Sequence, residues 1–256
     1  MLDPLVVYAI PLRPNDGSVD WKMVEENLKH SIASLKCQSD TNYRVMICGH
    51  DEPNIQYDDK VAWIKADFER PKTHGEGSLD KTRKRKAILQ NAKEQYPAGF
   101  YFFILDADDL LHRDVNAYVR SHDNRVGYYL PSGYVYNVSD NAIAEMAGSS
   151  GRYFYKSCGS CAVFWFDHND LYLEDVGMSP KFKILTKHSQ IPLLAEQQGL
   201  AIEGIPFFAG LYKVNHGGNL SKQQGKSKVQ EMHANNNAIV NEEEVSKIFS
   251  LFGGVF

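Results

Sequence analysis

The stretch FYFFILDADDLL, residues 100–111, decides the fold class of this chain. It opens with an uninterrupted aromatic and aliphatic run, which is typical of a strand buried on both faces of a parallel sheet. The run ends at Asp106, Asp108 and Asp109, so carboxylates gather where the strand meets solvent. In open α/β folds this carboxyl edge of the sheet is where ligands bind. The stretch therefore predicts a buried strand that leads directly into a charged binding site.

The segments before residue 100 alternate between strand and helix patterns. Apolar residues in segment 19–38 recur at steps of three or four residues, as on one face of an amphipathic helix. Strands joined by helices of this length connect through right-handed crossovers, so the alternation predicts an α/β fold with a mainly parallel central sheet. The expected strands are 5–10, 43–49, 61–66 and 100–106, and the expected helices are 19–38 and 80–96.

The second half of the chain is rich in Tyr and Phe, and it predicts further β structure with exposed aromatic faces. A helix interrupted near Pro192 is also expected, followed by a last helix with Glu residues in its first turn. Strands are expected within 126–137, 151–166 and 202–215, and helices at 183–199 and 241–252.

The composition excludes several classes of function. The 256 residues include 28 Lys and Arg against 32 Asp and Glu, a formal net charge of -4. Nucleic-acid binding depends on many cations that neutralise phosphates, so no nucleic acid is expected as a partner. No apolar run approaches the roughly 18 residues of a membrane-spanning helix. Asp3 and Pro4 stand where a signal peptide would carry basic and apolar residues, so we expect a cytoplasmic protein.

Four cysteines are too few for a disulfide scaffold of this size. Cys158 and Cys161 have the CxxC spacing that forms half of a zinc or redox site. Cys37 and Cys48 are too far apart in the sequence to supply the other half. We therefore favour buried or loop thiols over a metal or redox site.

The carboxylates that follow the FYFFIL run are candidate metal ligands. Hard oxygen ligands suit Mg²⁺ or Mn²⁺, and the phosphates of a substrate often complete the coordination of such ions. The alternative interpretation is a solvated turn that leads into a helix N-cap.

The order of several motifs resembles a family 2 glycosyltransferase of the GT-A fold. Those motifs are Pro11-Leu12-Arg13 after the first strand, SIASLKCQ at 31–38, YRVMICGHDEP at 43–53, and the DADD turn. The resemblance covers roughly residues 5–220. It implies a GT-A type αβα sandwich that binds a nucleotide-sugar. On this view residues 1–110 form the nucleotide-sugar half, 111–221 the acceptor half of the same domain, and 222–256 a helical extension.

The resemblance also implies roles for individual residues on the donor side. Asp51 would accept a hydrogen bond from the imino group of uracil. Asp106 would lie by the ribose and Asp108 would bind a Mn²⁺ or Mg²⁺ ion that bridges the diphosphate, with Asp109 the weaker candidate. A solvated basic helix face remains the alternative for the cationic residues. The expected base and ribose contacts are Pro11 and Arg13, and the expected cationic contacts are Lys81, Lys84 and Arg85.

His216 is the candidate for a further contact, because it follows a strand and precedes Gly217 and Gly218. The glycines let the backbone approach phosphate closely, and similar family members use a histidine in this region. We expect His216 either to bind the metal or to contact the diphosphate. Asn219 and Ser221 would donate to phosphate from the same turn.

The general base is where the sequence departs from the family. Family members of this type invert the anomeric carbon in one step and commonly use an aspartate from a Glu-Asp pair to take the acceptor proton. His188 stands where that pair is expected, and an imidazole ordinarily titrates near neutrality. Asp167, Glu174 and Asp175 are the rival bases.

Two features of the second half are expected to serve the acceptor or the surroundings of the enzyme. Exposed aromatic side chains would stack on sugar rings, with core packing as the alternative. The terminal segment IFSLFGGVF, residues 248–256, would dock on the domain, lie at a membrane surface, or mark a cut in a longer chain. The aromatic candidates are Tyr134, Tyr136, Tyr153, Tyr155 and Trp165.

The resemblance implies a metal-dependent inverting transfer of a sugar from a UDP-sugar to a saccharide or lipid-linked glycan, as in polysaccharide or lipopolysaccharide biosynthesis. The missing acidic pair keeps a second hypothesis open, a GT-A-fold module that binds sugar nucleotides without catalysis. A sugar nucleotidyltransferase ranks lower, because it would need a Gly-rich basic loop after the first strand. A phosphohydrolase is disfavoured, since its aspartate motif would follow the first strand of the fold.

Overall fold

The computed structural model describes residues 3–167, 170, 179–217 and 228–254. Its central feature is a seven-stranded sheet in the order β10-β6-β9-β4-β1-β2-β3. All neighbouring strands are parallel except β9, which runs antiparallel to both β4 and β6. The predicted α/β class with a mainly parallel sheet is therefore confirmed. The strands are β1 (Val6–Pro11), β2 (Tyr43–Gly49), β3 (Val61–Lys65), β4 (Phe100–Ile104), β6 (Gly127–Tyr129), β9 (Ala162–Phe166) and β10 (Glu203–Gly204).

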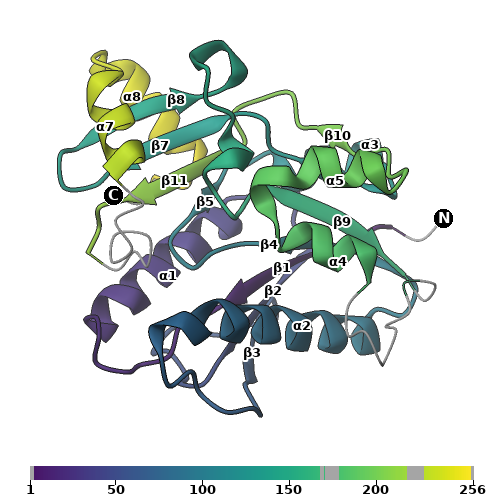
Figure 1. Ribbon diagram of the computed structural model, residues 1–256. Coiled ribbons are helices and arrows are strands. Elements are labelled where there is room, and N and C mark those ends of the chain that lie inside the picture. The colour runs from purple at the N-terminus through teal and green to yellow at the C-terminus, as the bar shows by residue number, and fades with distance from the viewer. Residues whose placement is uncertain (1–2, 168–169, 171–178, 218–227, 255–256) are drawn as a thin grey trace.

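Strand β1 lies where the chain changes direction across the sheet. Helix α1 (Trp21–Lys36) connects β1 to β2 on one side, and helix α2 (Gly77–Gln95) connects β3 back to β4 on the other side (Figure 1). Right-handed crossovers in opposite directions put the two helices on opposite faces of the sheet. The carboxyl ends of β1 and β4 therefore form a topological switch point, the place where open α/β sheets bind ligands.

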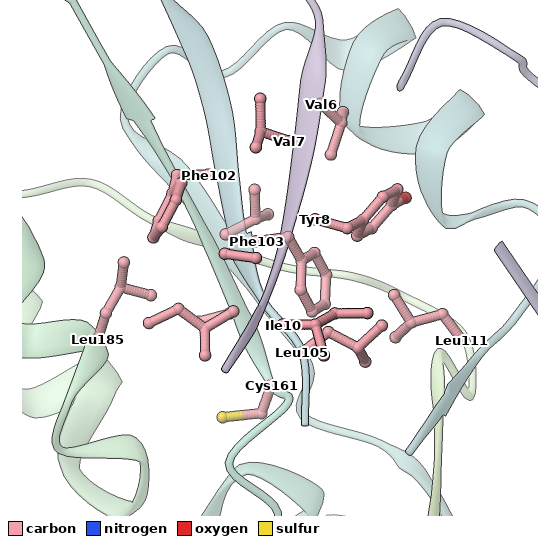
Figure 2. Packing of buried hydrophobic residues seen from close by; sticks show 14 of the residues in the cluster. Val6, Val7, Tyr8, Ile10, Phe102, Phe103, Leu105, Leu111, Cys161 and Leu185 are labelled. Carbon is pink, nitrogen blue, oxygen red and sulfur yellow. The ribbon is translucent and has the colours of Figure 1, made fainter. Parts of the chain in front are cut away.

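The side chains of β1 and β4 form the centre of the hydrophobic core. Successive side chains of a strand point to opposite faces. Figure 2 shows Phe102 on the side of Leu185 and Phe103 on the side of Leu111, and all four side chains are almost completely buried. Both faces of β4 are therefore covered, which explains why its sequence is apolar without alternation.

Helices α1 and α2 differ in what they bury. In α1 the carboxylate of Asp20 caps the N-terminus by accepting from the Lys22 backbone N–H at 3.0 Å, and the buried face is mainly apolar. In α2 the apolar residues lie toward the C-terminal half, whereas Lys84 and Arg85 are buried nearer the N-terminus. The fold thus carries the charged part of α2 to the switch point.

A second sheet of four strands, in the order β5-β11-β7-β8, lies beside α1. Helix α7 packs on β7 and β8, and helix α8 follows it at the C-terminal end of the chain (Figure 1). Ile248 and Phe252 are buried against the small sheet, so the C-terminal apolar segment docks on the domain as far as it is described. These elements are β5 (Leu110–Leu111), β7 (Gly133–Asn137), β8 (Ala142–Met146), β11 (Gly210–Val214), α7 (Lys228–Asn236) and α8 (Glu242–Leu251).

The membrane contact expected of the C-terminal segment has no support in the described residues, because Ile248 and Phe252 pack inside the domain. Within the described part of the chain, no helix combines the length and the apolar character needed to cross a bilayer.

Segment 151–166 differs from its prediction. Only β9 is a strand, and Phe154–Lys156 forms a 3-10 helix, η3. The strand starts late because the CGSC segment turns inward, where Cys158 and Ser160 bond to Asp109. The expectation of exposed aromatic faces is wrong for this strand, since the aromatic side chains of β9 are buried between two neighbouring strands.

Segment 183–199 contains the predicted interruption, but at a different residue. Helix α4 (Pro180–Leu185) ends before Thr186, and helix α5 (Ile191–Gln197) starts one residue before Pro192. Proline is tolerated in the first helical turn because its missing N–H has no partner there. Pro192 therefore starts a helix rather than breaking one. The intervening 3-10 helix η4 is His188–Gln190. The elements without a counterpart in the predictions include strands β5 and β8 and also η1 (His74–Glu76), η2 (Gly148–Ser150) and α3 (Val115–His122).

Candidate functional site

A cleft of about 810 Å³ opens at the carboxyl ends of β1 and β4. The N-terminal half of α2 forms one wall. The opposite wall is formed by the turn before β9, the segment after α4, and the end of β11 with the turn that follows it. The topology thus brings together side chains that are distant in the sequence. Nine of the residues that the sequence singled out line this cleft: Pro11, Arg13, Lys81, Lys84, Arg85, Asp106, Asp108, His188 and His216.

Asp106 is paired with two cationic side chains of the cleft. Lys81 Nζ lies 2.7 Å from Asp106 Oδ2, and Arg85 donates from Nη2 to Asp106 Oδ1 at 3.2 Å. Burial by itself would raise the pKa of Asp106, but the charges of Lys81 and Arg85 outweigh it and lower that pKa to about 2. Asp106 is therefore ionised at neutral pH and fixes two cations at the cleft floor.

Asp108 is in direct contact with His216 at the edge of the cleft. The distance from His216 Nε2 to Asp108 Oδ2 is 2.9 Å, and the ring's other nitrogen, Nδ1, lies 3.0 Å from Asn27 Nδ2. His216 is largely buried, whereas Asp108 is partly exposed to the cleft. Strand-end residues from β4 and β11 and a residue of α1 therefore meet at one point.

Asp109 turns away from the cleft into the protein. Its Oδ2 accepts from the Ser160 hydroxyl at 2.5 Å and from Cys158 Sγ at 3.1 Å, whereas its Oδ1 is buried without a hydrogen-bond partner. Burial is the main cause that raises the pKa of Asp109, and the neighbouring carboxylates of Asp106 and Asp108 add to it. Asp109 therefore anchors the CGSC turn beneath the cleft. Cys158 and Cys161 are buried free thiols, as the favoured interpretation of the cysteines has it.

Lys84 is almost completely buried and is committed to a carboxylate of its own helix. Its Nζ donates to Asp80 Oδ2 at 2.5 Å, and His50 Nε2 lies 2.7 Å from Asp80 Oδ1. Burial is the main cause that lowers the pKa of Lys84, and the Asp80 carboxylate opposes it. The sequence analysis gave no role to Asp80 or His50. His50 directly follows the apolar segment 43–49, which was a visible signal, whereas Asp80 stands at the start of a charged run.

Asp51 is paired with Arg70 and is not among the residues that line the cleft. The Arg70 guanidinium donates to both carboxylate oxygens at 2.6 and 2.9 Å, and the Asn15 backbone N–H donates at 2.8 Å. Burial works to raise the pKa of Asp51, but these hydrogen bonds prevail and lower it. Asp51 nevertheless lies close to the cleft. Its partner Asn15 stands between the lining residues Pro14 and Asp16, and its partner Arg70 directly precedes the lining residue Pro71.

His188 lies on the wall opposite α2. Its Nδ1 is 2.9 Å from the Tyr155 carbonyl oxygen, which can only accept, so Nδ1 carries a proton. In the neutral ring Nε2 is then the nitrogen with a free electron pair. His188 is also close enough to Asp106 for a positive charge on its ring to lower the pKa of Asp106.

The rival bases have different positions. Asp167 is hydrogen-bonded to the Trp165 indole and to residue 170, and it does not line the cleft. Glu174 and Asp175 lie outside the described residues, as do the phosphate donors proposed at Asn219 and Ser221.

The aromatic candidates divide into buried and accessible groups. Tyr136 and Trp165 are buried, and Tyr134 stacks on Phe208 within the small-sheet region. Tyr153 is 40% exposed and contacts Tyr155, whose carbonyl holds His188. Only the Tyr153–Tyr155 pair thus combines accessibility with a position beside the cleft.

Asp108 fits a divalent cation in position and chemistry, because its carboxylate opens onto the cleft. Among the described residues, no group of three or more His, Cys, Asp or Glu side chains converges as a complete metal site. An ion at Asp108 would therefore take further ligands from water or phosphate, as Mg²⁺ commonly does.

Neither the protein-family models nor the curated proteins include a match to this chain. The geometry of the cleft therefore carries the evidence for function.

Proposed function

We propose that this chain is a metal-dependent inverting glycosyltransferase of the GT-A fold. It transfers a sugar from a UDP-sugar to a saccharide or to a lipid-linked glycan, in the cytoplasm or at the inner face of the membrane. One observation carries the proposal. Two carboxylates, Asp106 and Asp108, share a cleft with Lys81 and Arg85 at the topological switch point of the sheet.

The charges of the cleft suit a nucleoside diphosphate. Lys81 and Arg85 lie beside the ionised Asp106, and a bound Mn²⁺ or Mg²⁺ at Asp108 would neutralise charge on the departing diphosphate. Pro11 and Arg13 line the end of the cleft that belongs to β1. This end suits the ribose and the uracil base, with Asp51 behind it.

His188 is the proposed general base. Its Nε2 takes the proton of the acceptor hydroxyl while the acceptor oxygen bonds to the anomeric carbon and the bond from that carbon to the UDP oxygen breaks. The Tyr155 carbonyl orients the ring for this step, because it holds the proton on Nδ1. Tyr153, exposed beside it, is the proposed stacking surface for an acceptor sugar.

Release of UDP from UDP-sugars in the presence of Mn²⁺ tests the proposal. Asp108→Ala should reduce release to background, whereas Asp59→Ala, an exposed carboxylate before β3, should leave it unchanged. Full activity of Asp108→Ala would refute the proposed site. UDP binding without turnover for any UDP-sugar and a range of saccharide acceptors would favour the non-catalytic module instead.

A further inference from the structure

One ring nitrogen of His216 faces a hydrogen-bond acceptor, and the other faces a hydrogen-bond donor. An ionised carboxylate only accepts hydrogen bonds, so the contact to Asp108 at 2.9 Å requires a proton on Nε2. The Asn27 amide nitrogen only donates, so the contact at 3.0 Å requires Nδ1 to accept. A neutral imidazole with its proton on Nε2 satisfies both contacts.

The orientation of the Asn27 amide decides whether this arrangement holds, because rotating the amide would exchange its oxygen and nitrogen. Lys213, from β11, fixes that orientation. Its ammonium lies 2.7 Å from Asn27 Oδ1, and an ammonium has no lone pair with which to accept. The amide oxygen must therefore face Lys213, which leaves the amide nitrogen facing His216.

Burial makes a mismatched hydrogen bond among Lys213, Asn27 and His216 costly, and so favours one arrangement of donors and acceptors. Asn27 is 8% exposed and Lys213 is 4% exposed, so water has little access to replace a mismatched contact. Two donors facing each other in such a place would cost about as much as leaving a buried polar group unpaired. Asn27 and Lys213 are 186 residues apart in the sequence, and α1 and β11 hold them together.

We propose that Lys213, acting through Asn27, is a positioning residue that keeps the ring proton of His216 on Nε2 and so makes His216 a hydrogen-bond donor. The inference rests on the proposed function, because the acceptor that it assigns, Asp108, is the carboxylate to which the proposed function gives the cation. A metal-bound histidine donates its other ring N–H to an acceptor, but here Asn27 offers a donor. A cation would therefore be held by Asp108 and phosphate without His216.

Nitrogen NMR of ¹⁵N-histidine-labelled full-length protein tests the relay without nucleotide. The His216 signal, assigned by its loss in His216→Gln, should show a protonated Nε2 and an unprotonated Nδ1. Lys213→Met should give a mixture of the two tautomers, because the amide is then free to rotate. Lys181→Met is the matched control, since that amine binds the Trp165 carbonyl elsewhere in the fold. A proton on Nδ1 in the unsubstituted protein would overturn the relay.

His216→Gln tests the consequence for the cation, because a glutamine amide can still donate a hydrogen bond to Asp108 but offers no ring nitrogen to a metal. Calorimetric titration with Mg²⁺ and UDP should show Mg²⁺ binding within about three-fold of that of the unsubstituted protein, because His216 is not a ligand. A loss of Mg²⁺ affinity of about ten-fold or more would contradict the inference.

The two proposals fail in different ways. The wrong tautomer with intact UDP release would overturn the relay and leave the glycosyltransferase standing. The expected tautomer with no UDP binding would leave the Lys213–Asn27–His216 relay standing and overturn the proposed function.

Discussion

The two walls of the cleft are built by different means. The α2 wall presents Lys81 and Arg85 from a long helix, and both are tied to Asp106 at the end of β4. The opposite wall presents His188 and His216 from short segments. The His188 ring contacts a backbone carbonyl, and the His216 ring contacts the side chains of Asp108 and Asn27.

This difference teaches how the fold separates two tasks. Ion pairs buried on regular elements create a rigid, charged floor suited to holding a diphosphate. Hydrogen bonds on turns orient individual imidazoles, which suits proton transfer and selective donation. Substitutions in the α2 wall should therefore affect the stability of the whole protein, whereas those in the opposite wall should affect chemistry or local order.

Arg85→Leu should have the largest effect on stability. It removes one cation from Asp106 in a nearly buried site, and breaking such a pair costs about 3 kcal/mol or more. Urea unfolding measures this loss. Arg83→Leu, an exposed neighbour on the same helix, should change the free energy of unfolding by less than about 1 kcal/mol. Equal losses in both variants would break the comparison between the walls.

His188→Ala should separate chemistry from binding. Loss of the base should slow turnover by about 10²-fold, while the affinity for UDP stays nearly the same. Stopped-assay rates together with calorimetric UDP titration measure both quantities. Unchanged turnover would show that His188 is not the base. One of the acidic rivals would then take the acceptor proton, and the opposite wall would not carry the proton transfer.

Ser179→Ala should distinguish local from global order. The Ser179 hydroxyl caps α4 by accepting from the Phe182 backbone N–H at 3.2 Å, and removing a cap costs about 1 kcal/mol. Hydrogen exchange should speed up in α4 and leave α2 unchanged. Faster exchange in both helices would show that the two walls open as one unit.

Arg70→Met should have the smallest effect. The pair with Asp51 is half exposed on the arginine side, so its contribution is below about 1 kcal/mol. The pKa of Asp51 is lowered in the folded state, so the contribution is present above the unfolded pKa of about 3.9 and is lost as the pH falls below it. Unfolding curves of Arg70→Met and the unsubstituted protein should differ at pH 7 and converge near pH 2. A difference that grows toward low pH would contradict the ion-pair account.

The same comparison explains how much the sequence could predict. The run before Asp106 and the alternation of strand and helix segments predicted the parallel part of the central sheet, because local periodicity determines it. The cationic contacts of the α2 wall were implied by the resemblance and not by periodicity. Local sequence patterns lose their predictive value where polar side chains from distant segments meet. Asn27 lies mid-helix and Lys213 lies mid-strand, and neither position differs in sequence from an ordinary solvated residue. Their contact depends on how α1 and β11 pack, which no local pattern encodes.

Calorimetric titration of UDP with and without Mn²⁺ tests the central claim most directly. The account predicts that Mn²⁺ strengthens UDP binding by at least about ten-fold in the unsubstituted protein and has no such effect in Asp108→Ala. UDP binding of equal strength with and without Mn²⁺, or an unchanged Mn²⁺ effect in Asp108→Ala, would contradict it.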